Sequence, residues 1–407
     1  MMEKKLHSFI CTEDNVRIGG RTMLENDIRY MDYTCTYVEF TFTGTYAEAE
    51  IISDLTPSED IFRAWAVVCV NGSVQPAKRF KLDSKRAAYE LYSSDKEETV
   101  TIRLMKVSEA AFAKMGVAEI RIDGELLPPP KPQYQRRIEF VGDSITCGYG
   151  IDGVWNKDVF STETENPIKG YAYKTAQLCK SEFQYVSWSG MGVLSSWVDE
   201  KAEKPLDNWL ITDIYPYTDS GLENTLGREG HENHTKWDFS KYVPQVIVFN
   251  MGTNDQSWTK KIPERVEQFG EKYYAFIKML REHNPNAYIV CAYGVMDDPL
   301  AETEEAQIER FKSELDDNIE FVRLPVQQEA DGTLIHKKDI TTSEIGTQFR
   351  FAPGERSYDG RSGKESVFNL SKDAPIFKLS HQLGIKGVLG GEYNYNHTEI
   401  SAEKRIW

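Results

Sequence analysis

Residues 138–150 read IEFVGDSITCGYG, an apolar run that ends in Gly142-Asp143-Ser144 and continues into polar, glycine-rich sequence. Short apolar runs bounded by such residues are typical of strands buried inside a parallel sheet. Ligands of open α/β sheets bind at the carboxyl ends of the strands. Ser144 is therefore delivered to the edge of the sheet where a nucleophile should stand. A turn whose Asp and Ser cap the next helix accounts for the same three residues, and both readings stay open at this point.

Four further apolar runs follow along the chain, separated by stretches long enough for helices. We expect β-strands at 183–187, 246–250, 288–292 and 319–324. Between the second and third of these, residues 262–283 carry apolar side chains at helical spacing, which predicts a helix packed on the sheet. Strands that alternate with helices predict an α/β fold built on a parallel sheet.

The sequence before residue 127 has a different pattern. Over residues 17–124, short segments in which apolar and polar residues alternate, such as 37–42 and 117–122, are broken by Gly, Asn and Asp. This pattern predicts the strands of a β-sandwich. Three successive prolines at 128–130 favour a stiff spacer. We therefore divide the chain into a β-sandwich domain (1–126), a proline-rich linker (127–135), an α/β domain (136–336) and a C-terminal segment with weak periodicity (337–407).

Composition excludes several classes of partner. The 407 residues carry a formal net charge of −16, which repels nucleic-acid phosphates and anionic membrane surfaces, so we expect neither as a partner. A secretory signal and an apolar stretch of about 20 residues are both absent from the sequence, and we expect a cytoplasmic protein. The six cysteines are scattered without a CxxC pair, which favours free, mostly buried thiols. Walker, zincin and dinucleotide-binding motifs are missing too, so we expect no cofactor and no metal.

Two more strand ends carry residues suited to catalysis. Residues 183–193, FQYVSWSGMGV, run into a turn with Gly190 and Gly192, and a glycine there lets a backbone N–H approach a substrate oxygen. Residues 246–258, VIVFNMGTNDQSW, deliver Asn254, whose side-chain amide can donate to an oxyanion, a contact worth about 3–4 kcal/mol of barrier. Each feature alone also fits an ordinary turn. Three strand ends in chain order with Ser, Gly and Asn favour a hydrolytic site.

The three motifs GDSITCGYG, SWSGMG and GTNDQSW resemble the first three conserved blocks of SGNH (GDSL-like) hydrolases, and in particular those of carbohydrate esterase family 2, acetyl esterases that act on xylan and related glycans. The resemblance covers about residues 20–332. It implies a flavodoxin-like, three-layer SGNH domain preceded by a jelly-roll β-sandwich.

The same resemblance implies roles for individual residues. Ser144 would be the nucleophile, and its own N–H, the N–H of Gly190 and the side chain of Asn254 would form the oxyanion hole. Gly190 matches the family's glycine better than Gly192 because it directly follows a Trp-Ser pair. Among the aromatic residues near these motifs, Trp258 is our first choice for stacking on a sugar ring, ahead of two tryptophans that fit a place in the core at least as well, Trp188 and Trp197.

A serine nucleophile needs a base, which is usually a histidine. SGNH enzymes carry this histidine on a loop after the fifth strand, and His336 follows the strand expected at 319–324 in that way, although the family's Asp-x-His-Pro signature is absent. The alternative is His397, which would make residues 326–396 a long insertion. We predict His336, with Asp331 as the nearest acidic residue to orient it, or else a Ser-His dyad steered by a backbone carbonyl, as family members can use.

Together these features predict a serine esterase that removes acetyl or other small acyl groups from carbohydrate such as acetylated xylan. The reaction would pass through an acyl-enzyme on Ser144. Two alternatives stay open. One is a catalytically impaired glycan-binding protein on the same fold, which would have no histidine in place. The other is a lipase or thioesterase of the same superfamily.

Overall fold

The computed structural model describes residues 5–53, 60–154 and 157–324, and beyond them the backbone of five strands within 344–403. The chain forms two compact units, Met1–Val326 and Gln327–Trp407, which are described separately. In this described part of the chain, no helix combines the length and the apolar character needed to cross a membrane.

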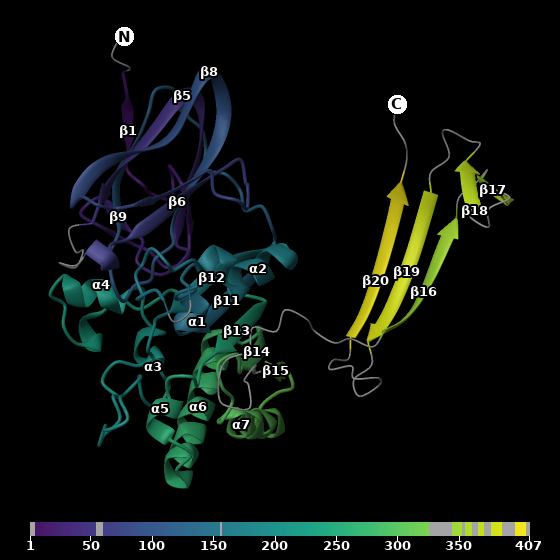
Figure 1. The fold of residues 1–407 in the computed structure, drawn as a ribbon. Helices are drawn as coiled ribbons and strands as arrows, with labels where there is room; N and C mark the ends of the chain where they lie inside the picture. The colour runs from purple at the N-terminus through teal and green to yellow at the C-terminus, as the bar shows by residue number, and fades with distance from the viewer. Residues whose placement is uncertain are drawn as a thin grey trace. The chain divides into compact units, whose positions relative to one another are not determined.

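The first part of unit 1 is an antiparallel sheet of ten strands (Figure 1). Its two long strands, β5 and β8, pair along most of their length, and alternate residues of β5 such as Phe40 and Phe42 enter an apolar core. The strands are β1 (His7–Phe9), β2 (Arg17–Gly19), β3 (Met23–Glu25), β4 (Ile28–Tyr30), β5 (Tyr37–Ile52), β6 (Trp65–Val70), β7 (Lys78–Lys81), β8 (Arg86–Lys106), β9 (Gly116–Ile122) and β10 (Glu125–Leu126). The strands expected at 37–42 and 117–122 are confirmed.

The second part of unit 1 is a parallel sheet of five strands in the order β12-β11-β13-β14-β15. Its strands are β11 (Arg136–Gly142), β12 (Ser181–Ser187), β13 (Val246–Asn250), β14 (Tyr288–Tyr293) and β15 (Ile319–Arg323). All five apolar runs are therefore strands, as predicted. This order is the doubly wound, flavodoxin-like arrangement, in which ligands bind where neighbouring strands connect in opposite directions. Here that point lies between β11 and β13.

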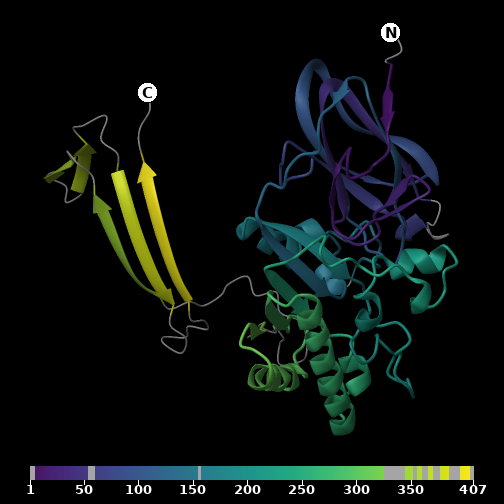
Figure 2. The ribbon, with the colours of Figure 1, turned by 180° about the vertical axis from the view of Figure 1, so that it is seen from behind.

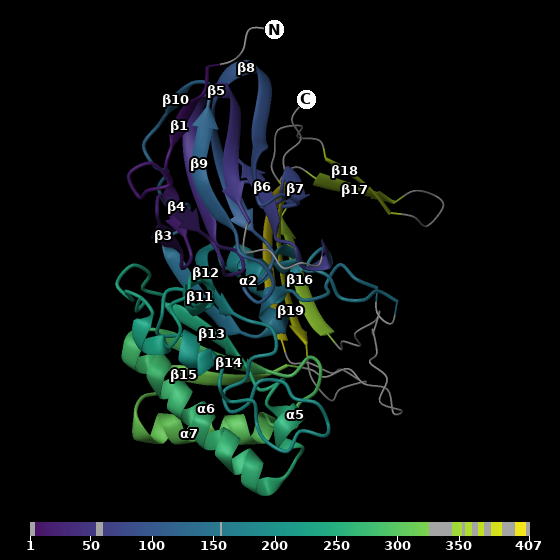
Figure 3. The ribbon, with the colours of Figure 1, turned by 90° about the vertical axis from the view of Figure 1, so that its left-hand side faces the viewer.

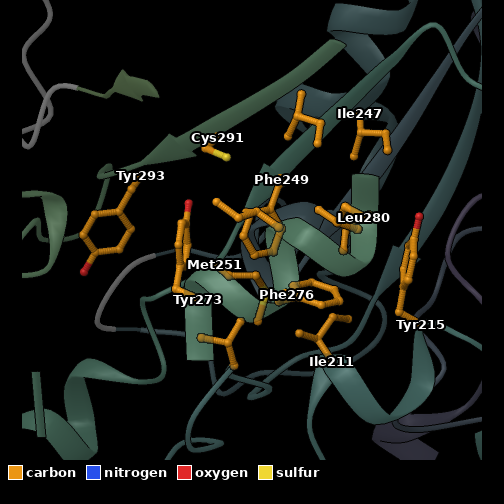
Figure 4. Close-up of a cluster of buried hydrophobic side chains, with 14 of the residues drawn as sticks. Ile211, Tyr215, Ile247, Phe249, Met251, Tyr273, Phe276, Leu280, Cys291 and Tyr293 are labelled. Atoms are coloured by element: carbon orange, nitrogen blue, oxygen red, sulfur yellow. The ribbon is translucent and has the colours of Figure 1, made fainter. Parts of the chain in front are cut away.

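The helices are α1 (Ser144–Cys147), α2 (Tyr171–Leu178), α3 (Ile211–Ile214), α4 (Ser220–Thr225), α5 (Gln256–Thr259), α6 (Pro263–His283) and α7 (Ala301–Glu314), with short 3-10 turns at η1 (Asp60–Phe62), η2 (Pro167–Lys169) and η3 (His231–Asn233). The long helix α6 is the one expected over 262–283. Figure 4 shows its side chain Phe276 beside Phe249 of β13, with ring centres 5.2 Å apart. Helices α6 and α7 thus cover one face of the parallel sheet.

The opposite face of the parallel sheet packs on helix α2 and on the antiparallel sheet. Ile138 and Phe140 of β11 belong to one apolar cluster with Tyr37 of β5 and Val67 of β6. In Figures 2 and 3 the parallel sheet accordingly lies between the antiparallel sheet and helices α6 and α7. The predicted fold class, an SGNH-type α/β domain preceded by an antiparallel β domain, is confirmed. The six cysteines are free thiols, and all except Cys179 are buried, as expected.

Unit 2 contains two small antiparallel sheets. Strands β16 (Glu344–Phe351), β19 (Ile376–Gly384) and β20 (Tyr395–Glu403) form the first, in the order β16-β19-β20. Strands β17 (Glu355–Asp359) and β18 (Glu365–Asn369) pair as the second.

Candidate active site

Ser144 stands at the carboxyl end of β11 as the first residue of helix α1. The turn needs Gly142, because a Cβ there would lie 2.1 Å from Oγ1 of Thr146. Asp143 caps the helix through Oδ1, which accepts the N–H of Ile145 at 3.0 Å. Ser144 itself is half-buried, and no described residue hydrogen-bonds its hydroxyl or its N–H. The capping role therefore falls to Asp143 and leaves Ser144 available for chemistry.

Asn254 follows β13 and reaches both of the other motifs. Its buried Nδ2 donates to the carbonyl of Met191 at 2.8 Å and to Oδ2 of Asp143 at 3.1 Å. Both amide hydrogens are engaged in this state, so donation to an oxyanion requires one bond to be exchanged, and the longer bond to Asp143 is the weaker of the two. Burial, together with the nearby charge of Asp255, raises the pKa of Asp143 to about 7.

The turn after β12 separates the two candidate glycines. Gly190 has a φ of +80°, and a Cβ built on it meets no atom within 4 Å, so this residue faces open space. No acceptor among the described residues engages its N–H. A Cβ on Gly192, in contrast, would lie 2.0 Å from the carbonyl oxygen of Ser195 and 2.6 Å from Oδ1 of Asp255. Gly192 is thus required for packing, and Gly190 is the glycine that a substrate oxygen can approach.

A residue that the sequence reasoning missed, Asp255, holds the segment after Gly192. Its buried carboxylate accepts the N–H groups of Val193, Leu194 and Ser195 at 3.1, 2.7 and 3.0 Å. Burial raises the pKa of Asp255 to about 6, and these three hydrogen bonds oppose the shift. The available signal was its place directly after Asn254. A carboxylate at that strand end can bind backbone N–H groups of the neighbouring loop.

Trp258 does not fit the sugar-stacking role expected of it. Its side chain is 7% exposed and belongs to the core beside α6. The guanidinium of Arg265 lies 3.7 Å from the ring centre and also donates to the carbonyl of Trp258 at 2.8 Å. Helix α5 turns this side chain inward, which periodicity could not indicate for an element of four residues. A sugar ring therefore finds no free face on Trp258.

Three other tryptophans surround Gly190. A hollow of about 260 Å³ is lined by Trp188, Trp197 and Trp209 together with Gly190. Trp197 is 60% exposed, and its backbone N–H donates to the carbonyl of Gly190 at 2.8 Å. Trp209 meets Trp188 edge-on, with ring centres 5.6 Å apart. From the sequence, Trp188 and Trp197 ranked behind Trp258 as residues for stacking on a sugar ring. Trp209 was not considered, because it lies in no motif.

The remaining candidates of the site are the two histidines considered as the catalytic base. His336 and Asp331 lie outside the described residues. The backbone of His397 belongs to β20, where it pairs with Gln382 of β19 in unit 2. The choice between the two histidines therefore stays a prediction.

Two family models match the chain. Residues 18–130 match the N-terminal domain of carbohydrate esterase 2, and residues 140–322 match the GDSL-like lipase/acylhydrolase family. Among curated proteins, the chain is similar to the cellulase/esterase CelE of Acetivibrio thermocellus, with 34% identity over 260 residues, which is 64% of this chain and 28% of that protein. The chain thus spans less than a third of that relative. It is also 25% identical to an acetylxylan esterase/glucomannan deacetylase of Cellvibrio japonicus over 71% of this chain and 74% of that protein.

Solved structures agree with these matches. A family two carbohydrate esterase from Clostridium thermocellum, in complex with cellohexaose, is 30% identical with a TM-score of 0.65, covering 78% of this chain and 90% of that one. An acetyl xylan esterase from the rumen bacterium Butyrivibrio proteoclasticus shares the fold, at 23% identity and a TM-score of 0.69, over 80% of this chain and 91% of that one. Family models match both domains, and the chain covers 90% of the 30% identical esterase from Clostridium thermocellum. The chain therefore belongs to carbohydrate esterase family 2.

Proposed function

We propose that this protein is a serine esterase that removes acetyl, or another small acyl group, from carbohydrate such as acetylated xylan or its oligosaccharides. The observation that carries the proposal is the position of Asn254. One amide nitrogen contacts the residue before Ser144 and the residue after Gly190. These contacts support a site in which Ser144 acts as the nucleophile and Gly190 and Asn254 supply oxyanion donors, beside the switch point of the sheet.

The reaction proposed is a two-step acyl transfer. The hydroxyl of Ser144 attacks the ester carbonyl, and a histidine accepts its proton and returns it to the departing sugar oxygen. The N–H groups of Ser144 and Gly190 meet the developing negative charge, and Asn254 joins them by exchanging its bond to Asp143. Water then attacks the acyl-enzyme with the same histidine as base, which releases the acid and the free serine.

We propose the tryptophan hollow as the place where a sugar ring rests. Aromatic faces bind the apolar faces of sugar rings, and Trp197 is exposed directly beside Gly190. The related esterase from Clostridium thermocellum has been solved with cellohexaose, a neutral glycan. A neutral substrate also suits a chain with a net charge of −16.

We propose His336 as the base because it follows the fifth strand, β15, closely in the sequence. If this is right, His336→Ala abolishes hydrolysis and His397→Ala changes little. The opposite result would assign the base to His397. Loss of activity in neither variant would exclude both. The cytoplasmic location expected from the sequence stays a prediction as well.

The test of the function uses 4-nitrophenyl acetate, an acetylated xylo-oligosaccharide and a serine-reactive phosphonate. Wild type is expected to hydrolyse both esters and to be labelled at Ser144. Ser144→Ala should lose several orders of magnitude in kcat while it stays folded, because it removes the covalent step. Ser240→Ala, at an exposed serine, is the matched control and should behave as wild type. A wild type that binds the oligosaccharide but neither hydrolyses nor reacts would favour the glycan-binding alternative, and a preference for long acyl chains would favour a lipase.

A further inference from the structure

Glu109 of the antiparallel domain lies at the edge of the proposed site, although the mechanism above does not use it. It follows β8 in the segment that leads to β9, and its side chain is fully buried. Its carboxylate contacts two residues of the parallel-sheet domain, Cys147 and Ser189, which lie just after β11 and β12.

The carboxylate of Glu109 binds Ser189 twice. Its Oε2 accepts the N–H of Ser189 at 2.7 Å, and its Oε1 accepts the Ser189 hydroxyl. Ser189 directly precedes Gly190, which has no side chain of its own to hold its peptide in place. Because Gly190 lies in the left-handed region with open space around it, the direction of its N–H depends on the neighbouring residues.

The same carboxylate also contacts the helix that carries the nucleophile. Sγ of Cys147, the last residue of α1, lies 3.8 Å from Oε2 of Glu109 and 3.2 Å from Oγ of Ser187. Ser144 is the first residue of this helix. One buried group therefore touches both segments that supply backbone donors to the proposed oxyanion hole.

Glu109 is paired with a second buried carboxyl group, Glu165. Glu165, also buried, accepts the N–H of Glu109 at 3.0 Å through Oε2. Burial and the charge of Glu109 raise the pKa of Glu165 well above its usual range. Burial raises the pKa of Glu109 too, but the two donors of Ser189 and the charge of Lys106 lower it. The pKa of Glu109 is thus raised as well, but less than that of Glu165. Ligand atoms of Glu109, Glu165 and Cys147 lie within 4.8 Å of one another, yet both oxygens of Glu109 are already engaged by Ser189.

We propose that Glu109 is a positioning residue for the oxyanion hole, by which the antiparallel domain completes the esterase site. This inference rests on the proposed function. Glu109 fixes Ser189 through its N–H and its hydroxyl, and in this way sets the peptide that leads to Gly190 and keeps it in register with helix α1. Loss of this anchor would move a donor, and a displacement of about 1 Å near reacting groups can lower a rate about 10²-fold.

The test compares variants of Glu109 with a matched control in the full chain. Glu109→Ala should lower kcat for 4-nitrophenyl acetate about 10- to 100-fold with KM within about threefold of wild type, because the oxyanion hole acts on the transition state. Glu109→Gln should recover most of this loss, since its amide can accept from the N–H of Ser189 and donate to the hydroxyl. The control is Glu39→Gln. Glu39 is buried in the same domain, but it binds Arg17 and Arg103, and Arg17 in turn binds Glu182 at the start of β12. Its loss should therefore lower stability and leave kcat unchanged.

The possible outcomes test the role of Glu109 and the proposed esterase function separately. In one outcome, wild type is active while Glu109→Ala is folded, as judged by circular dichroism, and keeps kcat within twofold of it. This result would overturn the inference and leave the proposed function intact. An equal loss of kcat in Glu39→Gln would also overturn it, because the effect would then be one of general stability. An inactive, unlabelled wild type would overturn the proposed function and this inference together.

If Glu109→Ala does not fold, Ser189→Ala replaces it. This variant removes one of the two bonds, and a loss of about 3- to 10-fold in kcat at unchanged KM supports the inference, whereas wild-type kcat overturns it.

Discussion

At the scale of single residues, Asn254 connects the parts of the proposed site. Its amide reaches the backbone beside Gly190 and the carboxylate beside Ser144, which lie on different strands. Because both hydrogens are engaged before substrate binds, the residue is held in one rotamer. Donation to an oxyanion then exchanges the longer bond to Asp143, while the bond to the carbonyl of Met191 keeps the side chain in position.

Asn254→Ala should therefore act on turnover. We expect kcat to fall about 10²- to 10³-fold and KM to change much less, because the lost interaction belongs to the transition state. Steady-state kinetics on an acetylated oligosaccharide measure both constants. A change confined to KM would instead make Asn254 a residue that binds the ground state.

The second prediction at this scale concerns Asp143 and pH. The pKa of Asp143 is raised from 3.8 to about 7 in the folded protein, mainly by burial. Between these values the native state holds a proton that the unfolded state has released, so stability falls as pH rises through this range, by up to about 1.4 kcal/mol per pH unit. Asp143→Asn removes this penalty. Its free energy of unfolding, relative to wild type, should rise from pH 4 to pH 7 and then level off.

Urea unfolding at pH 4, 5.5, 7 and 8 measures this difference. Asp238→Asn serves as the control, because hydrogen bonds from Ser240 lower the pKa of Asp238, which is therefore ionised in both states above pH 5.5. Its difference from wild type should stay constant from pH 5.5 to pH 8. A constant difference for Asp143→Asn as well would show that its folded-state pKa is not raised.

At the scale of elements, the turn after β12 is built on two glycines with different duties. Gly190 is glycine because of its positive φ, and Gly192 because other atoms occupy the space of a Cβ. The second requirement is stricter, since the atoms in the way include a carbonyl oxygen and the carboxylate of Asp255. That carboxylate in turn holds three N–H groups of the following segment.

We predict that the two alanine variants differ in stability. Gly190→Ala should cost about 1–2 kcal/mol, the price of a left-handed alanine. Gly192→Ala should cost more than about 3 kcal/mol, because it overpacks the turn and separates Asp255 from its donors. Thermal and urea unfolding of both variants provide the comparison. Equal losses would mean that backbone strain, and not packing, decides the turn.

At the scale of the whole molecule, the antiparallel domain and helix α2 together cover one face of the parallel sheet. Arg21, between β2 and β3, is fully buried in the other domain. Its guanidinium donates to the carbonyls of Tyr215 and Tyr217 at 2.5 and 2.9 Å and to Glu139 of β11 at 3.3 Å. Buried charge and shared apolar core together explain why residues 1–326 form one compact unit.

Removal of Arg21 should weaken both domains at once. Arg21→Ala leaves Glu139 buried without its cation, and we expect a loss of about 3–5 kcal/mol in the free energy of unfolding. Arg323→Ala is the matched control, since its partner Asp298 is partly exposed and such surface pairs contribute about 0–1 kcal/mol. Calorimetry of both variants gives the values. A loss for Arg21→Ala no larger than that of the control would mean that the interface does not depend on this charge.

Much of this protein follows from local sequence. Apolar runs ending in glycine or polar residues marked all five parallel strands, because strands inside a sheet that is covered on both faces are mostly apolar. The edge strand β15 is the exception in burial, since only Ile319 of its five residues is fully buried. The spacing of Phe269, Tyr273 and Phe276 marked helix α6 for the same reason, since burial selects one face. The motifs at Ser144, Gly190 and Asn254 could be recognised because each lies within one short turn, where local geometry restricts the choice of residue.

Contacts between segments distant in sequence were decided only by the tertiary structure. Trp258 carried no sign that Arg265 covers its ring, and Trp209 none that it lines the hollow beside Gly190. Glu109 lies 80 positions from Ser189 and in another domain, yet one carboxylate binds that residue twice. Periodicity reports which face of an element is buried, but not which partner covers it. That partner is determined by how the strands cross and how the two domains pack, and both depend on the whole chain.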